Sequence, residues 1–390
     1  MKRQLKAEPD KSILYKTVKP KKSFSGKTPN ILIGSFGYPN VSSGALVDEE
    51  YKDGSDNPKN YIEENKSIQE ILQNRQSFVN SMTRLEVKEL ENKFAEQTQD
   101  IAKSSKAVDA DVELERPLLK RMEFHEKALP HGPSAQLKNL EITSNPKIKN
   151  VVEQKTSDTD LKANAALLEM QEKGIDEYQL TKLLSTGTLG IGENRKMVPT
   201  KWSITAVDDQ LGEKLRKEVL DYKFCDFELY EGNYIGNYYT ILFLPGDWSY
   251  ELLEYTQGNT FYNPGSEAIV TKDYEFLQGR KKYVEETAGG YYAARLAALR
   301  QLANRKRQGR VIIFRVITDE YAAPLGVWTL RETVTKTMKQ KPEIYKSRED
   351  IIHAVKEKLA NLKVSKPKQL MAMSTLLVQE QPSLKRWINN

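Results

Sequence analysis

The stretch from residue 195 to residue 209 gathers side chains that could hold a nucleotide or a nucleic acid. Arginine, lysine and threonine bind phosphate oxygens, and an indole can stack on a base. Two adjacent aspartates could offer oxygen ligands to a divalent cation, but neighbouring side chains point in different directions on a strand or a helix, so we expect no metal there. A helix cap or a salt bridge is the structural alternative. The candidates are Arg195, Lys196, Thr200, Trp202, Asp208 and Asp209.

Glycines mark two further places where the backbone could approach a ligand closely. One is the turn after a short apolar strand at 30–34, and the other is the start of an alanine-rich helix at 285–300, where N–H groups can hold a phosphate. The structural alternatives are a plain turn and close packing of the helix against a strand. Neither place matches the dinucleotide fingerprint or the P-loop. The residues added to the candidate nucleotide or DNA pocket are Gly34, Gly37, Tyr38, Pro39 and Arg295.

Other residue types that could do chemistry are scattered. Acidic and apolar residues alternate at 107–115, which predicts a half-exposed strand with a solvated face rather than a two-metal nuclease site. His131 lies in a rigid loop and could act as a general base, but no partner is evident from the sequence. The chain has three histidines, widely spaced, and one cysteine, Cys225. We therefore predict no metal centre, no disulfide and no bound cofactor.

Basic residues are concentrated at the N-terminus. Residues 1–30 contain nine lysines or arginines against two acids, and this segment accounts for the positive net charge of the chain. A disordered basic arm can lie along DNA phosphates, where each neutralised phosphate releases counterions; a merely solvated tail is the alternative. A second basic patch follows the alanine-rich helix. The candidate contacts to the DNA backbone are Lys19, Lys21, Lys22, Arg305 and Arg307.

The last residues carry three apolar side chains in a polar segment, QPSLKRWI at 381–388. One turn of 3₁₀ helix would place Leu384, Trp387 and Ile388 on one side as an apolar plug, with the amide of Gln381 at its rim. The pattern resembles the PIP motif, which binds the sliding clamp PCNA, although Ile388 stands where many such motifs have a second aromatic residue. The alternative is a chain end that packs on its own core. We expect a flexible tail that binds PCNA.

Length and composition exclude several classes of protein. The chain has 390 residues, of which 29% are charged. No apolar run approaches the ~18–20 residues of a membrane helix, and no apolar stretch follows the basic N-terminus as it would in a secretory signal. We expect a soluble cytoplasmic protein with no membrane partner, associated with the nucleoid through DNA.

The periodicity of apolar residues predicts an α+β fold with an antiparallel or mixed sheet, flanking helices, a disordered basic N-terminal tail and a flexible C-terminal tail. A capping box at Ser67 and Glu70 marks the start of a helix, and aromatic-rich segments beyond residue 199 predict an antiparallel β-meander. The expected divisions are 1–28 (basic tail), 29–145 (N-terminal α/β region), 146–333 (core with a helix pair and the meander), 334–378 (C-terminal helices) and 379–390 (clamp-binding tail).

The helix pair at 161–186 is a candidate helix-turn-helix. A glycine ends the first helix, and Asp176 with Gln179 can cap the second. A DNA-reading helix needs arginine, asparagine or glutamine exposed at its N-terminal end. We expect Glu177, Tyr178, Gln179, Thr181 and Lys182 to be exposed, which is a modest set for reading a DNA sequence.

Five segments carry a resemblance to a known family: GSFGYPNV at 34–41, SKAVDADVELE at 105–115, HGPSA at 131–135, RKMVPTKWSITAVDD at 195–209 and GGYYAARL at 289–296. In this order, and with the C-terminal motif, they resemble the archaeal Nre family of DNA repair proteins. The resemblance implies a role in DNA repair and the damage response, with recruitment to DNA through PCNA. Members often begin with a four-cysteine zinc segment, which lysine-rich residues replace here. Two alternatives stay open: an enzyme acting on DNA or on a nucleotide-derived modification, for which the PIP motif serves only delivery, and a helix-turn-helix DNA-binding regulator.

Overall fold

The computed structural model describes residues 21–118, 122–125, 127–362 and 364–378. The chain divides into two compact units. The barrel unit consists of the described residues up to Leu211 together with Pro324–Trp328, and the sheet unit consists of Gly212–Ala323 and the described residues from Thr329 onward. Helices and mixed sheets occur in the described residues, so the expected α+β class is confirmed.

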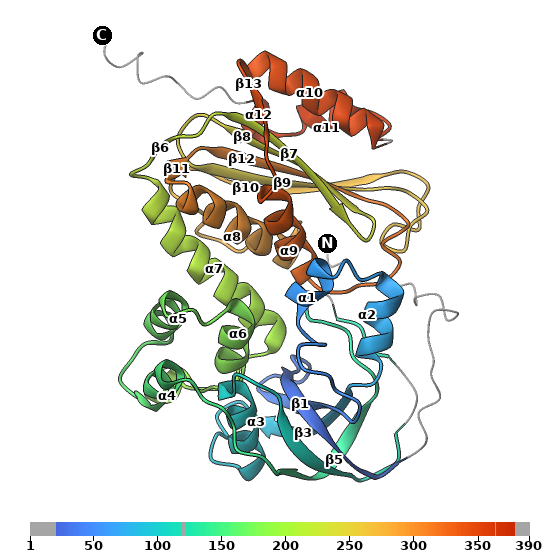
Figure 1. Ribbon diagram of the computed structural model, residues 1–390, viewed down its shortest axis with the longest axis vertical. Helices are drawn as coiled ribbons and strands as arrows, with labels where there is room; N and C mark the ends of the chain where they lie inside the picture. Colours follow the sequence, from blue (N-terminus) through green and yellow to red (C-terminus); the bar gives the residue numbers. More distant parts are fainter. Residues whose placement is uncertain (1–20, 119–121, 126, 363, 379–390) are drawn as a thin grey trace. The chain divides into compact units, whose positions relative to one another are not determined.

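The barrel unit is built on a closed barrel with the strand order β1-β2-β3-β5-β4 (Figure 1). β1 pairs antiparallel with both β2 and β4, whereas β3 and β5 run parallel. Helix α3 comes between β3 and β4 in the chain, and its residues Phe94 and Ile101 belong to the barrel core. This strand order with a helix after the third strand is that of the OB fold. The elements are β1 (Ser23–Ile33), β2 (Asn40–Asp48), β3 (Val79–Glu86), α3 (Lys93–Lys103), β4 (Val108–Leu114) and β5 (Ser134–Ile142).

Strand β1 begins at Ser23, seven residues before the strand predicted at 30–34. Residues 23–28, which we assigned to the basic tail, pair with residues 108–113 of β4. Phe24 is buried in the barrel core. The strand is therefore fixed by a partner about 85 positions away in the chain, which local composition cannot reveal.

The helices of the barrel unit include the expected pair, α5 and α6. Asp176 caps α6 by accepting from the backbone N–H of Gln179 at 3.0 Å, as predicted. Of the five side chains expected to be exposed, Glu177, Gln179 and Thr181 are buried and Tyr178 and Lys182 are half-buried, so that expectation is wrong. Gln179 instead donates to the carbonyl of Lys103 at the end of α3. The helices are α1 (Pro58–Glu63), α2 (Ile68–Arg75), α4 (Asn150–Ser157), α5 (Ala163–Glu172), α6 (Glu177–Ser185) and the first part of α7 (Thr200–Val219).

The sheet unit contains a six-stranded sheet in the order β10-β9-β12-β8-β7-β13. The meander prediction is right for β7 and β8, which are antiparallel neighbours, but wrong for β9, because β12 lies between β8 and β9 and runs parallel to β9. Every residue of β12 is buried, in keeping with its central position. A short second sheet joins β11 to β6. The strands are β6 (Lys223–Phe224), β7 (Phe227–Tyr234), β8 (Asn237–Leu244), β9 (Ser249–Thr256), β10 (Ile269–Glu275), β11 (Arg307–Gln308), β12 (Arg310–Ile317) and β13 (Glu343–Tyr345).

Helices cover both faces of this sheet (Figure 1). α8 and α9 pack on one face around Ile313, and α10, α11 and α12 pack on the other around Ile312. Neighbouring strand residues point to opposite faces, so the two cores alternate along β12. Cys225 is buried in the first of these cores, and burial raises the pKa of its thiol to about 12. The helices are α8 (Ala288–Asn304), α9 (Trp328–Met338), α10 (Arg348–Asn361), α11 (Pro367–Ala372) and α12 (Thr375–Val378).

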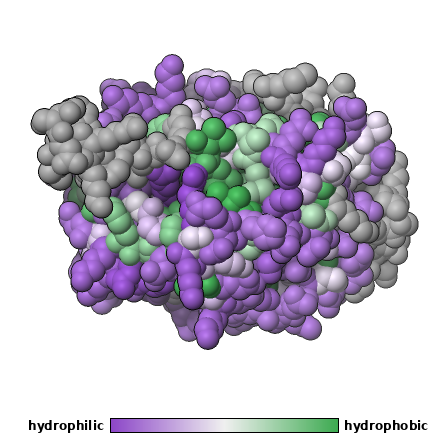
Figure 2. Space-filling model, turned by 90° about the horizontal axis from the view of Figure 1, so that it is seen from above, coloured by the Kyte–Doolittle hydropathy of each residue, from purple (hydrophilic) through white to green (hydrophobic). Residues whose placement is uncertain are grey.

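Figure 2 shows a face on which hydrophilic residues predominate and hydrophobic residues gather near the centre. Within the described part of the chain, no helix combines the length and the apolar character needed to cross a bilayer.

Candidate nucleic-acid interface

The loop between β1 and β2 holds four of the predicted pocket residues, from Gly34 to Pro39. The N–H of Asn40 donates to the carbonyl of Gly37 at 2.9 Å and closes the turn. Gly37 has φ of +81°, and a Cβ there would lie 2.9 Å from the Asn40 carbonyl oxygen. A glycine is therefore required for this tight turn, because L side chains rarely adopt such a conformation.

The tip of this loop presents aromatic side chains to solvent. Phe36 is 84% exposed, Tyr38 42% and Trp202 43%. The rings of Tyr38 and Trp202 lie 5.3 Å apart and are tilted by 56°. We call Phe36, Tyr38 and Trp202 the aromatic patch. Large apolar side chains left this exposed in one place commonly mark a binding surface.

The first turn of α7 positions Trp202 against the loop. The hydroxyl of Thr200 accepts a hydrogen bond from the N–H of Ile33, the last residue of β1, at 2.9 Å. Thr200 is buried, so its hydroxyl serves the junction of strand and helix. This hydrogen bond joins the end of β1 to the start of α7, the two elements that carry the aromatic patch.

Positive charge accompanies the aromatic patch. The guanidinium of Arg84 on β3 lies 5.8 Å from the ring centre of Phe36, and its Nη1 donates to the carbonyl of Asn40 at 3.1 Å. Lys201 and Lys196 are half-buried near the start of α7. Aromatic faces beside arginine and lysine are the usual surface on which unpaired bases stack while cations meet the phosphates.

Asp208 and Asp209 are less exposed than the residues of the aromatic patch. Asp208 is buried and Asp209 half-buried on α7, and both have interaction partners within the structure.

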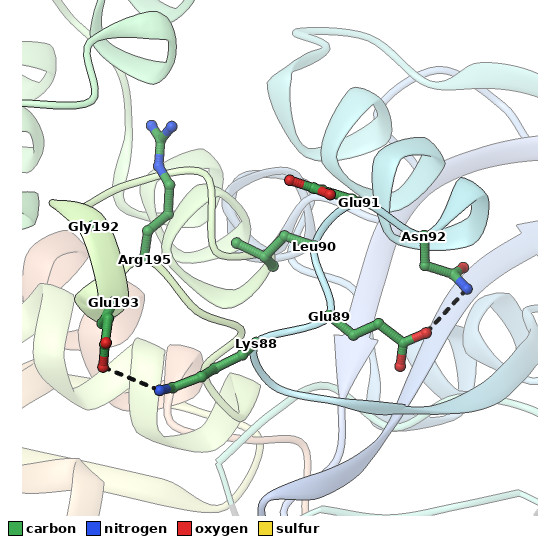
Figure 3. Close-up of a pocket in the computed structure, with 8 residues that line it drawn as sticks. All are labelled: Lys88, Glu89, Leu90, Glu91, Asn92, Gly192, Glu193 and Arg195. Carbon is green, nitrogen blue, oxygen red and sulfur yellow. Dashed lines mark hydrogen bonds and ion pairs between the residues drawn. The ribbon is translucent and has the colours of Figure 1, made fainter.

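Arg195 lies at the edge of a hollow of about 750 Å³ (Figure 3). Its Nη2 donates to the carbonyl oxygens of Thr156 and Thr188, and Figure 3 shows its side chain extending away from the Lys88–Glu193 ion pair. Burial lowers the pKa of Arg195. Three acids line the hollow against two cations, which disfavours an anion such as phosphate. The lining residues are Lys88, Glu89, Leu90, Glu91, Asn92, Gly192, Glu193 and Arg195.

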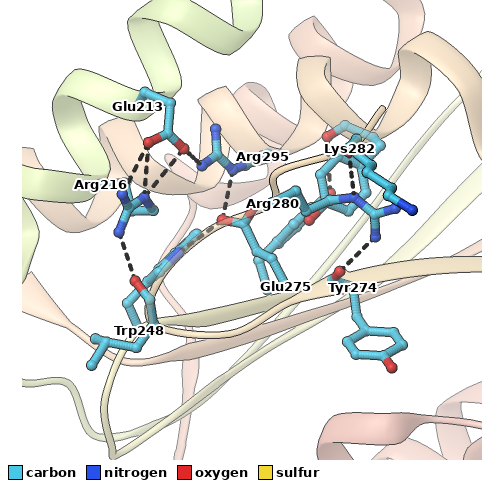
Figure 4. Close-up of polar contacts among 11 residues, drawn as sticks. Glu213, Arg216, Trp248, Tyr274, Glu275, Arg280, Lys282 and Arg295 are labelled. Carbon is cyan, nitrogen blue, oxygen red and sulfur yellow. Dashed lines mark hydrogen bonds and ion pairs between the residues drawn. The ribbon is translucent and has the colours of Figure 1, made fainter. Parts of the chain in front are cut away.

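Arg295 belongs to the sheet unit, where it joins a buried ionic network (Figure 4). Its Nε donates to Oε1 of Glu275 at 2.7 Å, and its Nη2 pairs with Glu213. Burial disfavours the charged guanidinium, but the carboxylates of Glu275 and Glu213 more than compensate and raise the pKa of Arg295. The side chain is 1% exposed, so its contacts identify it as a structural cation.

The candidate contacts to the DNA backbone differ in their surroundings. Lys21 forms an exposed ion pair with Glu49 at 2.9 Å, and Lys22 is exposed. Arg305 pairs with the buried carboxylate of Glu228, whose hydrogen bond raises the pKa of that arginine. The remaining two are Arg307, which is half-buried, and Lys19, which lies outside the described residues.

The PIP-motif residues Gln381, Leu384, Trp387 and Ile388 also lie outside the described residues.

The acidic residues of the alternating segment lie on β4. Asp109 and Asp111 are exposed, which matches a solvated strand face. That strand prediction is confirmed.

Two residues of the interface, Phe36 and Arg84, and the pairing of His125 with His131 were not predicted from the sequence. Phe36 stands between glycines in the β1–β2 turn, and an aromatic residue at the tip of such a turn was the available signal. Arg84 gives no such signal, because β2–β3 pairing brings it to the loop. His131, for which no partner is evident from the sequence, lies with its ring centre 5.1 Å from that of His125. Burial lowers the pKa of His125 to about 4 and that of His131 to about 3, so both are neutral at pH 7.

Comparison with known proteins identifies the family. The model of the archaeal Nre N-terminal region matches residues 7–263, and that of the Nre C-terminal region matches residues 275–387. The chain is 33% identical to the DNA repair protein NreA of Haloferax volcanii, over 82% of this chain and 78% of the relative. It is 35% identical to NreA of Archaeoglobus fulgidus (85% and 84% covered) and 32% identical to NreB of the same organism (87% and 85%). No solved structure matches significantly. The chain belongs to the archaeal Nre family.

Proposed function

We propose that this chain is a DNA repair factor that binds single-stranded DNA on the aromatic patch of its barrel unit. The exposed Tyr38–Trp202 pair carries the proposal, because half-exposed rings in contact offer bases a stacking surface. The relatives named DNA repair proteins support the biological context. A duplex hides its base faces, so a stacking surface favours unpaired DNA.

The position of the patch in the barrel gives independent support. Oligonucleotides bind OB folds on the face of strands 2 and 3 and on the loops that follow strands 1 and 4. Phe36 and Tyr38 are in the loop after strand 1, and Arg84 is on strand 3. Fold alone does not decide function, so the aromatic and basic side chains at this place bear the argument.

We also propose that residues 381–388 recruit the chain to DNA through the sliding clamp PCNA. Leu384, Trp387 and Ile388 form the apolar plug of the PIP pattern, and Gln381 its amide. The Nre C-terminal match extends to residue 387, so this segment lies within or beside the family region. Clamp recruitment would bring the aromatic patch to sites where repair exposes unpaired bases.

Fluorescence anisotropy with a labelled oligonucleotide tests the DNA site. Stacking on one aromatic residue contributes about 1–3 kcal/mol, so Trp202→Ala or Tyr38→Ala should weaken binding about 5- to 150-fold. Phe224→Ala is the matched control, since Phe224 is an exposed aromatic residue of the sheet unit (53%). Equal affinity of the three variants and the unaltered chain would refute the site.

A pull-down of the full chain with PCNA from the same organism tests recruitment. Trp387→Ala should abolish capture because Trp387 is the central anchor of the plug. Trp202→Ala should leave capture unchanged, which separates clamp binding from DNA binding. Capture that survives Trp387→Ala would refute the role of the C-terminal motif.

A further inference from the structure

The segment between β4 and β5 brings two histidines and a glutamate together, independently of the aromatic patch. The N–H of Glu123 donates to the carbonyl of His131 at 2.8 Å, and the N–H of His131 donates to the carbonyl of Glu123 at 3.1 Å. Residues directly opposed in such an antiparallel bridge have side chains on the same side, and a residue two positions along faces that side too. The bridge thus sets Glu123 opposite His131, and the ring centre of His125 lies 5.1 Å from that of His131.

The three side chains are spaced as metal ligands are. One potential ligand atom from each lies within 4.8 Å of the other two, and Nε2 of His131 is 3.9 Å from Oε2 of Glu123. Tetrahedral ligands bonded to zinc at ~2.1 Å are roughly 3.4 Å apart. A small inward rotation of the side chains would therefore complete the site.

The hydrogen bonds of His131 leave its second nitrogen available. Nδ1 lies 2.8 Å from the carbonyl oxygen of Gly132, which can only accept, so Nδ1 carries the proton and Nε2 presents a lone pair. His131 is fully buried, and neither its Nε2 nor that of His125 has a hydrogen-bond partner in the described structure. An unpaired buried nitrogen is costly, whereas metal-binding histidines typically donate their other N–H to a carbonyl in this way.

We propose that Glu123, His125 and His131 bind a divalent transition-metal ion, with zinc as the best fit and water completing the coordination. Two imidazoles and one carboxylate with an open position form the ligand set of hydrolytic zinc centres. The same set suits ferrous iron, so Fe²⁺ is the second ion to test. The carboxylate of Glu123 is 36% exposed, which gives the ion a route from solvent.

Nearby charge sets the expected strength of binding. Arg75 and Lys201 act electrostatically on His125 and oppose the approach of a cation. Arg75 is held in place, since its Nε donates to the carbonyl of Pro130 at 2.8 Å. We therefore expect these two cations to weaken zinc binding.

Zinc titration of the full, tag-free chain tests this site after EDTA treatment and desalting. A chromophoric chelator in competition should report one zinc per chain, and Glu123→Gln and His125→Gln should each weaken binding by at least about tenfold. His353→Gln is the control, because His353 pairs with Glu357 at 3.2 Å on the exposed face of α10. Binding well below one zinc per chain, or equal affinity in His125→Gln, would overturn the proposal, and so would a loss in His353→Gln.

The Co²⁺ spectrum of the unaltered chain gives a second readout that does not depend on how the variants fold. Four-coordinate Co²⁺ bound by nitrogen and oxygen should show visible d–d bands without a thiolate charge-transfer band, because Cys225 is not part of the cluster. A thiolate band, or only the spectrum of hydrated Co²⁺, would reject the assigned ligands. Tighter binding of Fe²⁺ than of zinc under anaerobic conditions would keep the site and replace zinc as its metal.

Discussion

Replacing Glu275 with glutamine should strongly destabilise the sheet unit. Oε1 of Glu275 accepts from Nε of Arg295 at 2.7 Å and from Nε1 of Trp248 at 2.9 Å. The side chains of Arg295 and Glu275 are each 1% exposed, so the substitution deprives a buried guanidinium of the carboxylate that its Nε contacts. Removing one partner of a buried ion pair costs about 3–5 kcal/mol, and the retained amide oxygen offsets about 1 kcal/mol. We expect a loss of about 3 kcal/mol.

Urea unfolding followed by circular dichroism and tryptophan fluorescence measures this loss. Glu193→Gln is the matched control, since the pair of Glu193 with Lys88 is 3.3 Å long with side chains 92% and 54% exposed. Exposed pairs contribute at most about 1 kcal/mol, so the control should unfold almost like the unaltered chain. A Glu275→Gln variant as stable as the control would show that the network of Figure 4 does not hold the sheet unit together.

Three further predictions concern pH, backbone conformation and salt. Burial raises the pKa of Glu213, but the hydrogen bonds and positive charges of Arg216 and Arg295 lower it more, to below the ordinary value of 4.5. This carboxylate therefore stabilises the fold above about pH 4.5 and loses that effect as pH falls, so Glu213→Gln should flatten the stability profile in acid, and an unchanged profile would contradict the shift. Gly37→Ala should lower stability by about 1–2 kcal/mol, because φ is positive there, and unaltered thermal melting would argue against the turn. Deleting residues 1–20, which spares β1, should reduce the salt dependence of DNA binding, by about 0.7 in log–log slope for each lost phosphate contact; an unchanged slope would exclude the basic arm.

Local signals in the sequence predicted those elements whose causes are local. The capping box at Ser67 is present, since its hydroxyl accepts from the N–H of Glu70, and Asp176 caps α6. The alternating segment at 107–115 forms β4. Caps and alternation depend on residues within a few positions of one another, so the sequence displays them directly.

Boundaries that depend on distant partners could not be predicted. The apolar residues between Ile68 and Met82 recur at helical spacing and predict a single helix there. The helix ends at Arg75 and β3 begins at Val79, because the pairing of β3 with β2 and β5 outweighs that spacing. The 20-residue helix α7 was missed, because the β-branched and aromatic residues around Trp202 suggested strands.

The sequence predicted some residues of the candidate site by their type, but it could not predict which of them the fold brings together. Tyr38 and Trp202 were chosen by residue type, and only the fold brings their rings into contact. Arg295 was chosen by its place after two glycines, whereas burial and two carboxylates give it a structural role. The sequence does not reveal that His125 and His131 lie together, because the bridge between Glu123 and His131 has no recognisable turn or helix signal.

The burial of Cys225 has a practical consequence for studying this molecule. Only the thiolate reacts with maleimides, and a thiol with a pKa of about 12 that is shielded from solvent stays inert at neutral pH. A dye or spin label will therefore attach to a cysteine introduced at an exposed position outside the proposed sites, such as Lys339, without removal of the native residue. Single-site labelling can then follow DNA and clamp encounters in the otherwise unaltered chain.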